Sequence, residues 1–271
     1  MSTLEWKRYY GFSRTPFSKT LAPSQLLGLP GHLEAVARIR WAIDERGIGV
    51  LTGEVGVGKT VAARAAVAAL DASKHTIVYL PNPAVGARGI HQHLAHALGV
   101  APRFHRGALI TQTADLLARE RDERDKHTVL IIDEAHLLDP DQLEQIRILT
   151  NTDMDADTHL AIVLLGQPTL RRILRRGSYA ALDQRIATRS HLHPLNSTQT
   201  ADYIRHHLTI AGRSDPLFAD DATNAIAHAA RGLPRQIGNL AVAALIAGYT
   251  RRNTIIDTNC ATAAIADHTT D

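Results

Sequence analysis

One short stretch of the chain has the residue types and the spacing of a phosphate-binding loop. Residues 53–60 read GEVGVGKT, which matches the pattern GxxxxGK[ST] in full. Glycines let the backbone N–H groups of such a loop turn toward one point, and a following helix adds the partial positive charge of its N-terminus. Lys59 can then reach the β- and γ-phosphates of a nucleotide, while the Thr60 hydroxyl can bind Mg²⁺. The predicted loop residues are Gly53, Glu54, Val55, Gly56, Val57, Gly58, Lys59, Thr60 and Val61.

An acidic pair farther along the chain supplies a second set of reactive groups. The segment VLIIDEAH places Asp133 and Glu134 directly after the apolar residues 129–132. In open α/β sheets ligands bind beyond the carboxyl ends of the strands, so Asp133 is predicted to hold Mg²⁺ through water. Glu134 is then placed to orient or deprotonate the water that attacks the terminal phosphate. A protein that only holds nucleotide does not need this glutamate, so the pair predicts hydrolysis.

A glutamine follows another apolar run and has two interpretations. In IVLLGQP, Gln167 would lie just beyond the end of a strand, where its amide could contact the γ-phosphate or the attacking water. It could instead belong to a turn into a helix, with Pro168 at the first helical position. We favour the contact with phosphate or water.

Three arginines are candidates for contact with the charge on the phosphates. Arg185 and Arg189 lie in LDQRIATRSHLHPL, beside an expected strand. An arginine supplied across a subunit interface can stabilise charge that develops on the transferred phosphoryl group. We prefer Arg185 because Arg189 lies nearer the strand itself, although both could be surface arginines. Arg235 follows the helix-opening Pro234 in GLPRQIGNL, where the helix dipole disfavours a cation, so we expect the γ-phosphate or a nearby carboxylate beside it.

The overall composition fits a globular protein with a packed core. Of the 271 residues, 45% are hydrophobic and 21% are charged; the formal net charge of +3 permits a polyanionic partner without requiring one. No apolar run approaches the roughly 20 residues that cross a bilayer, and the N-terminus lacks the apolar stretch of a signal peptide. The single Cys260 excludes an internal disulfide, and the 15 histidines lack the spacing of a metal site. We expect a cytoplasmic protein.

Strands that alternate with helices must position these groups. The expected strands are short apolar segments at residues 48–53, 76–80, 128–132, 160–166 and 189–195. Continuous apolar strands separated by helices predict an α/β fold with a parallel five-stranded sheet covered on both faces. From residue 197 onward only helical patterns remain. We therefore predict an α/β nucleotide-binding domain over residues 1–196, which begins with an aromatic loop at 1–30, and a small all-helical domain over 197–271.

Together these motifs resemble those of an AAA+ ATPase. The stretch YYGFSRTPFSKTLAPSQLLGLPGHLEAVARIRWAIDERGIGVLTGEVGVGKT is similar to the start of the ExeA-like family, also called general secretion pathway protein A. LLGQPTL and LDQRIATRSHLHPL are similar to that family as well, so the resemblance covers about residues 8–250. A small departure is the phenylalanine of YGFSRTPF, where the family usually has leucine.

The resemblance implies a P-loop AAA+ fold with a helical lid, ATP and Mg²⁺ as cofactors, and hydrolysis of ATP to ADP and phosphate. It implies that nucleotide is held between the two domains and between neighbouring subunits of a ring or helical filament, so that Arg185 acts on a neighbour's ATP. Adenine is expected near the N-terminal aromatic segment, which Tyr10, Phe12 or Phe17 could line. These three rings could instead simply pack beneath a loop.

The family divides by biology. Some members assemble an outer-membrane secretin and carry a transmembrane segment and a peptidoglycan-binding region, both of which we expect this chain to lack because it ends with its helical lid. Stand-alone members resemble the transposition helpers IstB, TniB and TnsC, which bind DNA with ATP, polymerise, and recruit or activate a transposase. We favour this second branch, with a homo-oligomer, weakly sequence-specific double-stranded DNA and a transposase as partners, and no membrane. The alternatives are an ATPase that assembles a protein complex without DNA, and a nucleotide switch that does not hydrolyse.

Two basic clusters could contact DNA phosphates. One is LRRILRR at residues 170–176, and the other is Arg103 with Arg106. Phosphate contacts need only cations on one face and carry no sequence readout. Either cluster could instead be a solvated helix face or part of a subunit interface.

Overall fold

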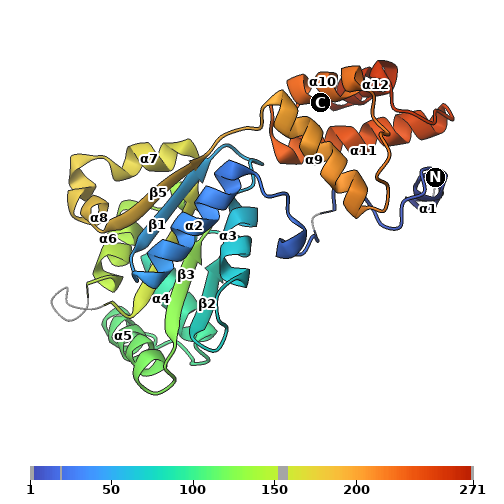
Figure 1. The fold of residues 1–271 in the computed structure, drawn as a ribbon. Helices are drawn as coiled ribbons and strands as arrows, with labels where there is room; N and C mark the ends of the chain where they lie inside the picture. Colours follow the sequence, from blue (N-terminus) through green and yellow to red (C-terminus); the bar gives the residue numbers. More distant parts are fainter. Residues whose placement is uncertain (1–2, 19, 152–157, 270–271) are drawn as a thin grey trace. The chain divides into compact units, whose positions relative to one another are not determined.

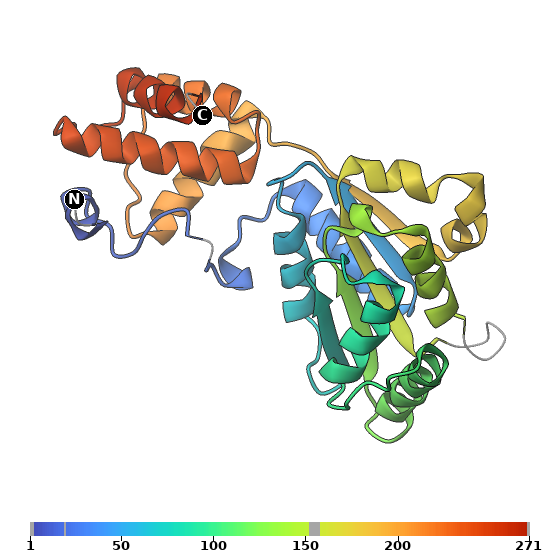
Figure 2. The ribbon, with the colours of Figure 1, turned by 180° about the vertical axis from the view of Figure 1, so that it is seen from behind.

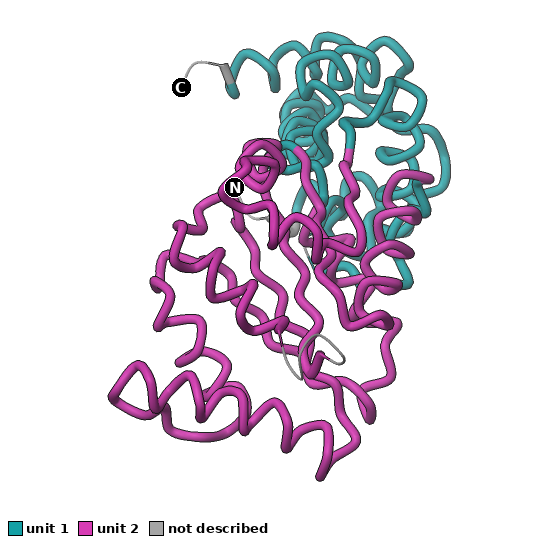
Figure 3. Tube along the Cα trace, turned by 90° about the vertical axis from the view of Figure 1, so that its left-hand side faces the viewer, with its two compact units in different colours: residues 1–29, 54–58, 193–271 teal, residues 30–53, 59–192 magenta. Residues whose placement is uncertain are grey.

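The computed structural model describes residues 3–18, 20–151 and 158–269, which fall into two compact units (Figure 3). Unit 2 holds the sheet and comprises residues 30–53 and 59–192. Unit 1 is built mainly from helices and comprises residues 1–29, 54–58 and 193–271.

Unit 2 is built on five parallel strands in the order β2-β3-β4-β1-β5 (Figure 1). The strands are β1 (Ile48–Gly53), β2 (His75–Leu80), β3 (His127–Ile132), β4 (Leu160–Gly166) and β5 (Ile186–Leu192). The predicted fold class is therefore confirmed. Because all five strands are parallel, the segments that follow β1, β3 and β4 all begin at the same side of the sheet, where the carboxyl ends of the strands lie.

Helices cover both faces of this sheet (Figures 1 and 2). One face is covered by α2 (Pro30–Asp44) and α3 (Lys59–Ala68). The other face carries α4 (Gly86–Ala97), α5 (Arg106–Asp122) and α6 (Pro140–Leu149), while α7 (Pro168–Leu174) and α8 (Ala180–Gln184) connect β4 to β5. Asp139 caps α6, because its carboxylate accepts a hydrogen bond from the Gln142 N–H, and Pro140 is the first helical residue.

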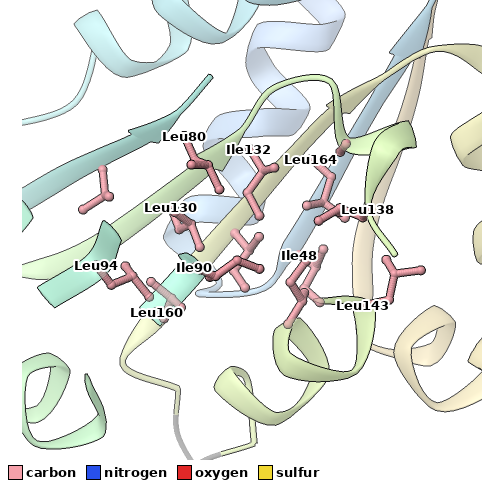
Figure 4. Close-up of a cluster of buried hydrophobic side chains, with 14 of the residues drawn as sticks. Ile48, Leu80, Ile90, Leu94, Leu130, Ile132, Leu138, Leu143, Leu160 and Leu164 are labelled. Atoms are coloured by element: carbon pink, nitrogen blue, oxygen red, sulfur yellow. The ribbon is translucent and has the colours of Figure 1, made fainter. Parts of the chain in front are cut away.

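The main core of unit 2 lies between the sheet and the helices α4, α5 and α6 (Figure 4). Successive strand residues point to opposite faces, so Ile48, Leu130 and Leu164 all reach this core, where they meet Ile90 and Leu143 from the helices. All five side chains are at most 1% exposed. Burying each contributes about 1.5–3 kcal/mol, which fixes the strand ends that carry the polar residues of the site.

The fifth strand begins earlier than the sequence pattern indicates. We predicted residues 189–195, whereas β5 spans Ile186–Leu192 and pairs with β1 from Ile48 onward. β5 is an edge strand with only its two terminal residues buried, so its apolar pattern is weak. Arg185 therefore directly precedes the strand, and Arg189 lies within it.

Unit 1 contains the helical C-terminal region that the sequence predicts. Its helices are α1 (Thr3–Tyr9), α9 (Ser197–Ile210), α10 (Asp220–Ala229), α11 (Pro234–Thr250) and α12 (Thr258–Thr269). Asn196 caps α9, because its side chain accepts a hydrogen bond from the Gln199 N–H, and the side chain of Gln199 accepts one from the Asn196 N–H. Across the described parts of both units, no helix is long and apolar enough to cross a bilayer.

The N-terminal segment differs from the predicted division into domains. We assigned residues 1–30 to the α/β domain as a loop, whereas the structure forms helix α1 there and groups residues 1–29 with the C-terminal helices. Trp6, Tyr10 and Phe12 are buried in the core of unit 1. Trp6 and Tyr10 are four residues apart, so their side chains lie on the same face of this helical segment. Burial of the two rings stabilises the packing of residues 1–29 in unit 1.

His207 makes the stability of unit 1 dependent on pH. The ring is 6% exposed and stacks on Phe17 with a centroid distance of 5.0 Å. Burial, with a smaller contribution from His206, lowers the pKa of His207 to about 4. The folded state therefore keeps the ring neutral at a pH where the unfolded chain takes up a proton, so this stability is present above pH 6.5 and is lost as the pH falls toward 4. We expect a loss of about 3 kcal/mol across this window.

Urea unfolding followed by Trp6 fluorescence, in a Trp41→Phe background, measures this loss. His207→Gln should flatten the pH dependence between pH 6.5 and 4. The matched control is His228→Gln, which changes an exposed histidine on α10 of the same unit and should leave the dependence intact. An unchanged pH profile in His207→Gln would contradict this assignment.

Candidate active site

The phosphate-binding loop connects the end of β1 at Gly53 to the start of α3 at Lys59. Gly56 has φ of +82° and Gly58 has φ of +108°, a region that only glycine adopts without strain. The motif therefore places glycine where the backbone requires it. The first N–H groups of α3 have no acceptors within the helix, so they are available to an anion held by the loop.

Lys59 lies inside this loop. Its side-chain ammonium donates a hydrogen bond to the carbonyl of Gly53 at 2.9 Å, and the residue is 7% exposed. A buried ammonium needs anionic or hydrogen-bonding partners, and phosphate oxygens supply both. This geometry fits the predicted contact of Lys59 with the phosphates, which stays a prediction.

The two halves of the site meet between Thr60 and Asp133. The Thr60 hydroxyl donates to Oδ2 of Asp133 at 2.8 Å, although the two residues lie far apart in the sequence. Asp133 is 6% exposed and follows β3, as predicted. A hydroxyl and a carboxylate are the hard oxygen donors that Mg²⁺ prefers, so these residues fit the expected metal ion. When bound there, Mg²⁺ would stabilise negative charge on the phosphates.

Tyr79 is a member of this cluster that the sequence analysis missed. From β2, its hydroxyl donates to the same Oδ2 of Asp133 at 3.0 Å. Burial and, next, the negative charge of Asp133 raise the pKa of Tyr79 to about 12, so its hydroxyl stays protonated and donates. The available signal was a tyrosine one residue before the end of β2, in register with Ile131 of the neighbouring strand β3.

Glu134 has a strained backbone and an accessible side chain. Its φ of 51° and ψ of 32° lie in the left-handed region, and its own N–H donates to Oδ1 of Asp133 at 2.9 Å. Such conformations cost about 1–3 kcal/mol and cluster at functional sites. The carboxylate is 45% exposed, and its Oε2 lies 3.5 Å from Nδ1 of His136, beyond a strong hydrogen bond. It therefore remains accessible to a water molecule, as its predicted role requires.

Gln167 directly follows β4, the strand between β3 and β1. The sheet order thus places it between the acidic pair and the phosphate-binding loop. Gln167 occupies the N-cap position of α7, with Pro168 at the first helical position, yet its side chain makes no capping hydrogen bond. The amide is not required to begin the helix, which favours its predicted role at the γ-phosphate.

Arg185 lies at the other end of the sheet from the loop of its own chain. It caps the C-terminus of α8 just before β5, and its guanidinium donates to the carbonyl of Thr150 at 3.0 Å. β5 is parallel to β1 and has seven residues, so roughly 20 Å separate the start of β5 from the edge where the loop lies. Arg189 pairs with Asp183 at 2.6 Å. An arginine that acts from this end must act on another subunit, as predicted for Arg185.

Arg235 lies in the first turn of α11, within unit 1. Its backbone N–H donates to the carbonyl of Gly56 at 3.2 Å, and a Cβ on Gly56 would lie 3.0 Å from Cβ of Arg235. The glycine therefore permits this close approach. The predicted contact between the Arg235 guanidinium and the γ-phosphate stays a prediction.

The aromatic residues expected near adenine have packing roles. Tyr10 is 3% and Phe12 is 8% exposed in the core of unit 1, and the Tyr10 hydroxyl donates to the carbonyl of Asn253 at 3.2 Å. Phe17 stacks on His207. These contacts favour the alternative interpretation, in which all three rings pack beneath a loop.

A comparison with known families matches residues 42–174 to an AAA domain. The match includes the phosphate-binding loop, Tyr79, the acidic pair and Gln167, and it ends at Leu174 in α7. The phosphate-binding loop and the acidic pair within this match are typical of an ATPase domain that takes ATP with Mg²⁺.

The chain is also similar to General secretion pathway protein A of Aeromonas hydrophila, at 33% identity over 253 residues. The match covers 91% of this chain and 45% of that protein, so the chain spans less than half of its relative. This match confirms the predicted similarity to general secretion pathway protein A, and it extends beyond the residues that match the AAA domain. The narrower likeness to transposition helpers stays a prediction.

Several solved structures share the fold. Cdc6p of Pyrobaculum aerophilum has a TM-score of 0.70 at 20% identity, covering 89% of this chain and 67% of its own. The Aeropyrum pernix ORC2 protein, solved as ADPNP-ADP complexes, has a TM-score of 0.71 at 16% identity, with 93% and 70% covered. Thermotoga maritima RuvB, as its P216G mutant, reaches 0.61 at 18% identity, with 92% and 73% covered. These likenesses confirm the P-loop AAA+ fold around the AAA domain.

Proposed function

We propose that this protein is a cytoplasmic ATPase whose ATP-bound form self-associates on double-stranded DNA and recruits or activates a transposase. In this proposal Lys59 and the loop hold ATP, Thr60 and Asp133 hold Mg²⁺, and Glu134 activates the attacking water. Gln167 and Arg235 detect the γ-phosphate, and Arg185 completes the site of a neighbouring subunit.

A group of unpaired arginines on unit 2 carries the DNA part of the proposal. We call it the α7 patch, and it comprises Arg171, Arg172, Arg175 and Arg176. All four are exposed, and none makes an ion pair within the described part of the chain. Other surface arginines do pair, as Arg147 does with Glu144 at 2.6 Å. Arg171 and Arg172 lie on α7, and Arg175 and Arg176 directly follow it. Unpaired guanidinium groups so close along the chain suit phosphate contacts that carry no sequence readout.

The comparisons add support at the level of fold. The Aeropyrum pernix ORC1 protein, solved in complex with DNA, has a TM-score of 0.67 at 18% identity. Thermotoga maritima RuvB is described as a Holliday junction branch migration motor and has a TM-score of 0.57. Proteins with this fold therefore include ones that act on DNA.

A second candidate function is assembly of a protein complex without DNA. The similarity to General secretion pathway protein A at 33% identity favours it. On this alternative, the protein partner stimulates ATP hydrolysis, DNA has no effect on the rate, and the α7 patch contacts protein.

Binding of a labelled duplex, measured by fluorescence anisotropy with a non-hydrolysable ATP analogue or with ADP, tests the proposal. We expect tight binding only with the analogue, filaments or rings by electron microscopy, and loss of both in Lys59→Ala. Changing Arg172, Arg175 and Arg176 together to glutamine should reduce the salt dependence of log K by about 3. The matched control changes the ion-paired Arg38, Arg147 and Arg205 to glutamine and should have little effect. Absence of analogue-dependent duplex binding at low salt would reject the DNA part, and failure to stimulate strand transfer by a purified transposase would reject the recruitment part.

A further inference from the structure

A second cationic surface of unit 2 presents an exposed aromatic ring. Phe104 lies between α4 and α5 and is 77% exposed, the highest value among the exposed large apolar side chains of the described residues. Leaving a phenylalanine in water forgoes about 1.5–3 kcal/mol of burial, so such a ring points to a contact made outside the chain.

The backbone that carries Phe104 is fixed by two hydrogen bonds from one side chain. The N–H of Arg103 donates to Oε1 of Gln112 at 2.8 Å, and Nε2 of Gln112 donates to the carbonyl of Ala101 at 3.0 Å. Gln112 lies on α5, so the helix holds the residues before Phe104 in place. The exposure of the ring is thus part of an ordered conformation.

A guanidinium already lies over the ring. Cζ of Arg88, in α4, is 5.2 Å from the ring centroid of Phe104, and the ring of His105 meets it edge-on at 5.4 Å. The guanidinium makes a cation–π contact with the ring, and a nucleobase can add to such a contact because every base offers a π-face.

The sequence segment around Phe104 contains cations and lacks carboxylates. No aspartate or glutamate occurs between Asp71 and Asp115 in the sequence. Arg88, Arg103 and Arg106 are all exposed, and none has an ion-pair partner among the residues that the structure describes. In a nucleic acid strand each base is flanked by phosphates, so a ring with cations on either side can stack on the base while the cations bind the phosphates.

We propose that Phe104, Arg88, Arg103 and Arg106 form a binding site for an unpaired base of DNA and its flanking phosphates. The ring stacks on the base and the guanidinium groups bind phosphates. The site rests on the proposed function in that its ligand is DNA, but it recognises a strand whose bases are accessible rather than the intact duplex that the α7 patch contacts.

Anisotropy with a labelled single strand and with the matching duplex, both with the ATP analogue, tests this site. Phe104→Ala should lower the affinity for the single strand about tenfold, while the affinity for the duplex stays within about twofold. Phe104→Trp, which keeps a stacking surface, should restore single-strand binding. Changing Arg103 and Arg106 to glutamine should weaken binding and reduce its salt dependence by about 1.4 for the single strand.

Leu33→Ala is the matched control, because Leu33 is also a highly exposed apolar side chain of the same unit, 58% exposed on α2, but has no π-face on which a base can stack. Circular dichroism and thermal unfolding report that each variant is folded. Equal effects of Phe104→Ala and Leu33→Ala, or equal losses for single strand and duplex, would overturn the site. If polyglutamate displaced the labelled single strand as effectively as unlabelled DNA does, the DNA site would be overturned, and an acidic protein would be the better candidate for the partner. If the duplex binds but single-strand binding does not depend on Phe104, this site alone is rejected. If single-strand binding depends on Phe104 but the duplex does not bind, the proposed function alone is rejected.

Discussion

Glu134→Gln is expected to lower ATP turnover by about a hundredfold to ten-thousandfold while ATP binding is retained. The substitution keeps the size of the side chain but removes the carboxylate that would accept a proton from the attacking water. The side chain is 45% exposed and makes no short ion pair, so its loss should leave folding unaffected. Steady-state phosphate release measures turnover, and binding of a fluorescent ATP analogue measures affinity.

Glu45→Gln is the control for this prediction, since Glu45 is an exposed residue just after α2 and should leave turnover unchanged. If Glu134→Gln hydrolysed ATP at the wild-type rate, another group would have to activate the water. If it lost nucleotide binding as well, Glu134 would instead have a role in holding the loop.

The parts of the site that the sequence predicts are those set by local pattern. The phosphate-binding loop needs glycine at Gly56 and Gly58, where φ is positive, and the motif records this requirement directly. The positions of Asp133 and Gln167 follow from two buried strands whose apolar runs are continuous and whose ends are polar. Strand period, helix caps and the rule for ligand position in parallel sheets are enough to bring these groups to one edge.

The parts that escaped prediction depend on contacts between distant segments. Tyr79 joins the site only because β2 pairs with β3 in a register that places it beside Ile131, and nothing in its own segment shows that pairing. Residues 1–29 join the C-terminal helices through contacts such as the bond from the Ser13 N–H to the carbonyl of Ala211 at 2.9 Å. Adjacency in sequence to the α/β domain suggested the opposite assignment. Such pairings are decided by burial across the whole chain rather than by local propensity.

The proposed arginine in trans leads to a prediction of similar size. Arg185→Ala is expected to lower ATP turnover about a thousandfold while ATP binding and self-association persist. The reason is geometric, since Arg185 precedes β5 at the end of the sheet away from its own phosphate-binding loop. Arg189→Ala should change turnover by no more than about threefold, because that guanidinium pairs with Asp183 of its own chain in an exposed bridge.

Mixed assemblies separate action in trans from a structural role. A subunit with Arg185→Ala keeps Glu134 in its own nucleotide site but supplies no arginine to the neighbouring subunit. A subunit with Glu134→Gln supplies the arginine but cannot activate water in its own site. Where each interface joins one nucleotide site to one arginine, an equal mixture restores about a quarter of wild-type turnover, because about a quarter of the interfaces combine both intact groups. The bond from Arg185 to the carbonyl of Thr150 gives the residue a local role as well, and thermal unfolding of the variant reports the stability that this bond contributes. If the mixture stayed as inactive as the two variants while all copies assembled, Arg185 would act only within its own subunit, and hydrolysis would not depend on contact between neighbours through this residue.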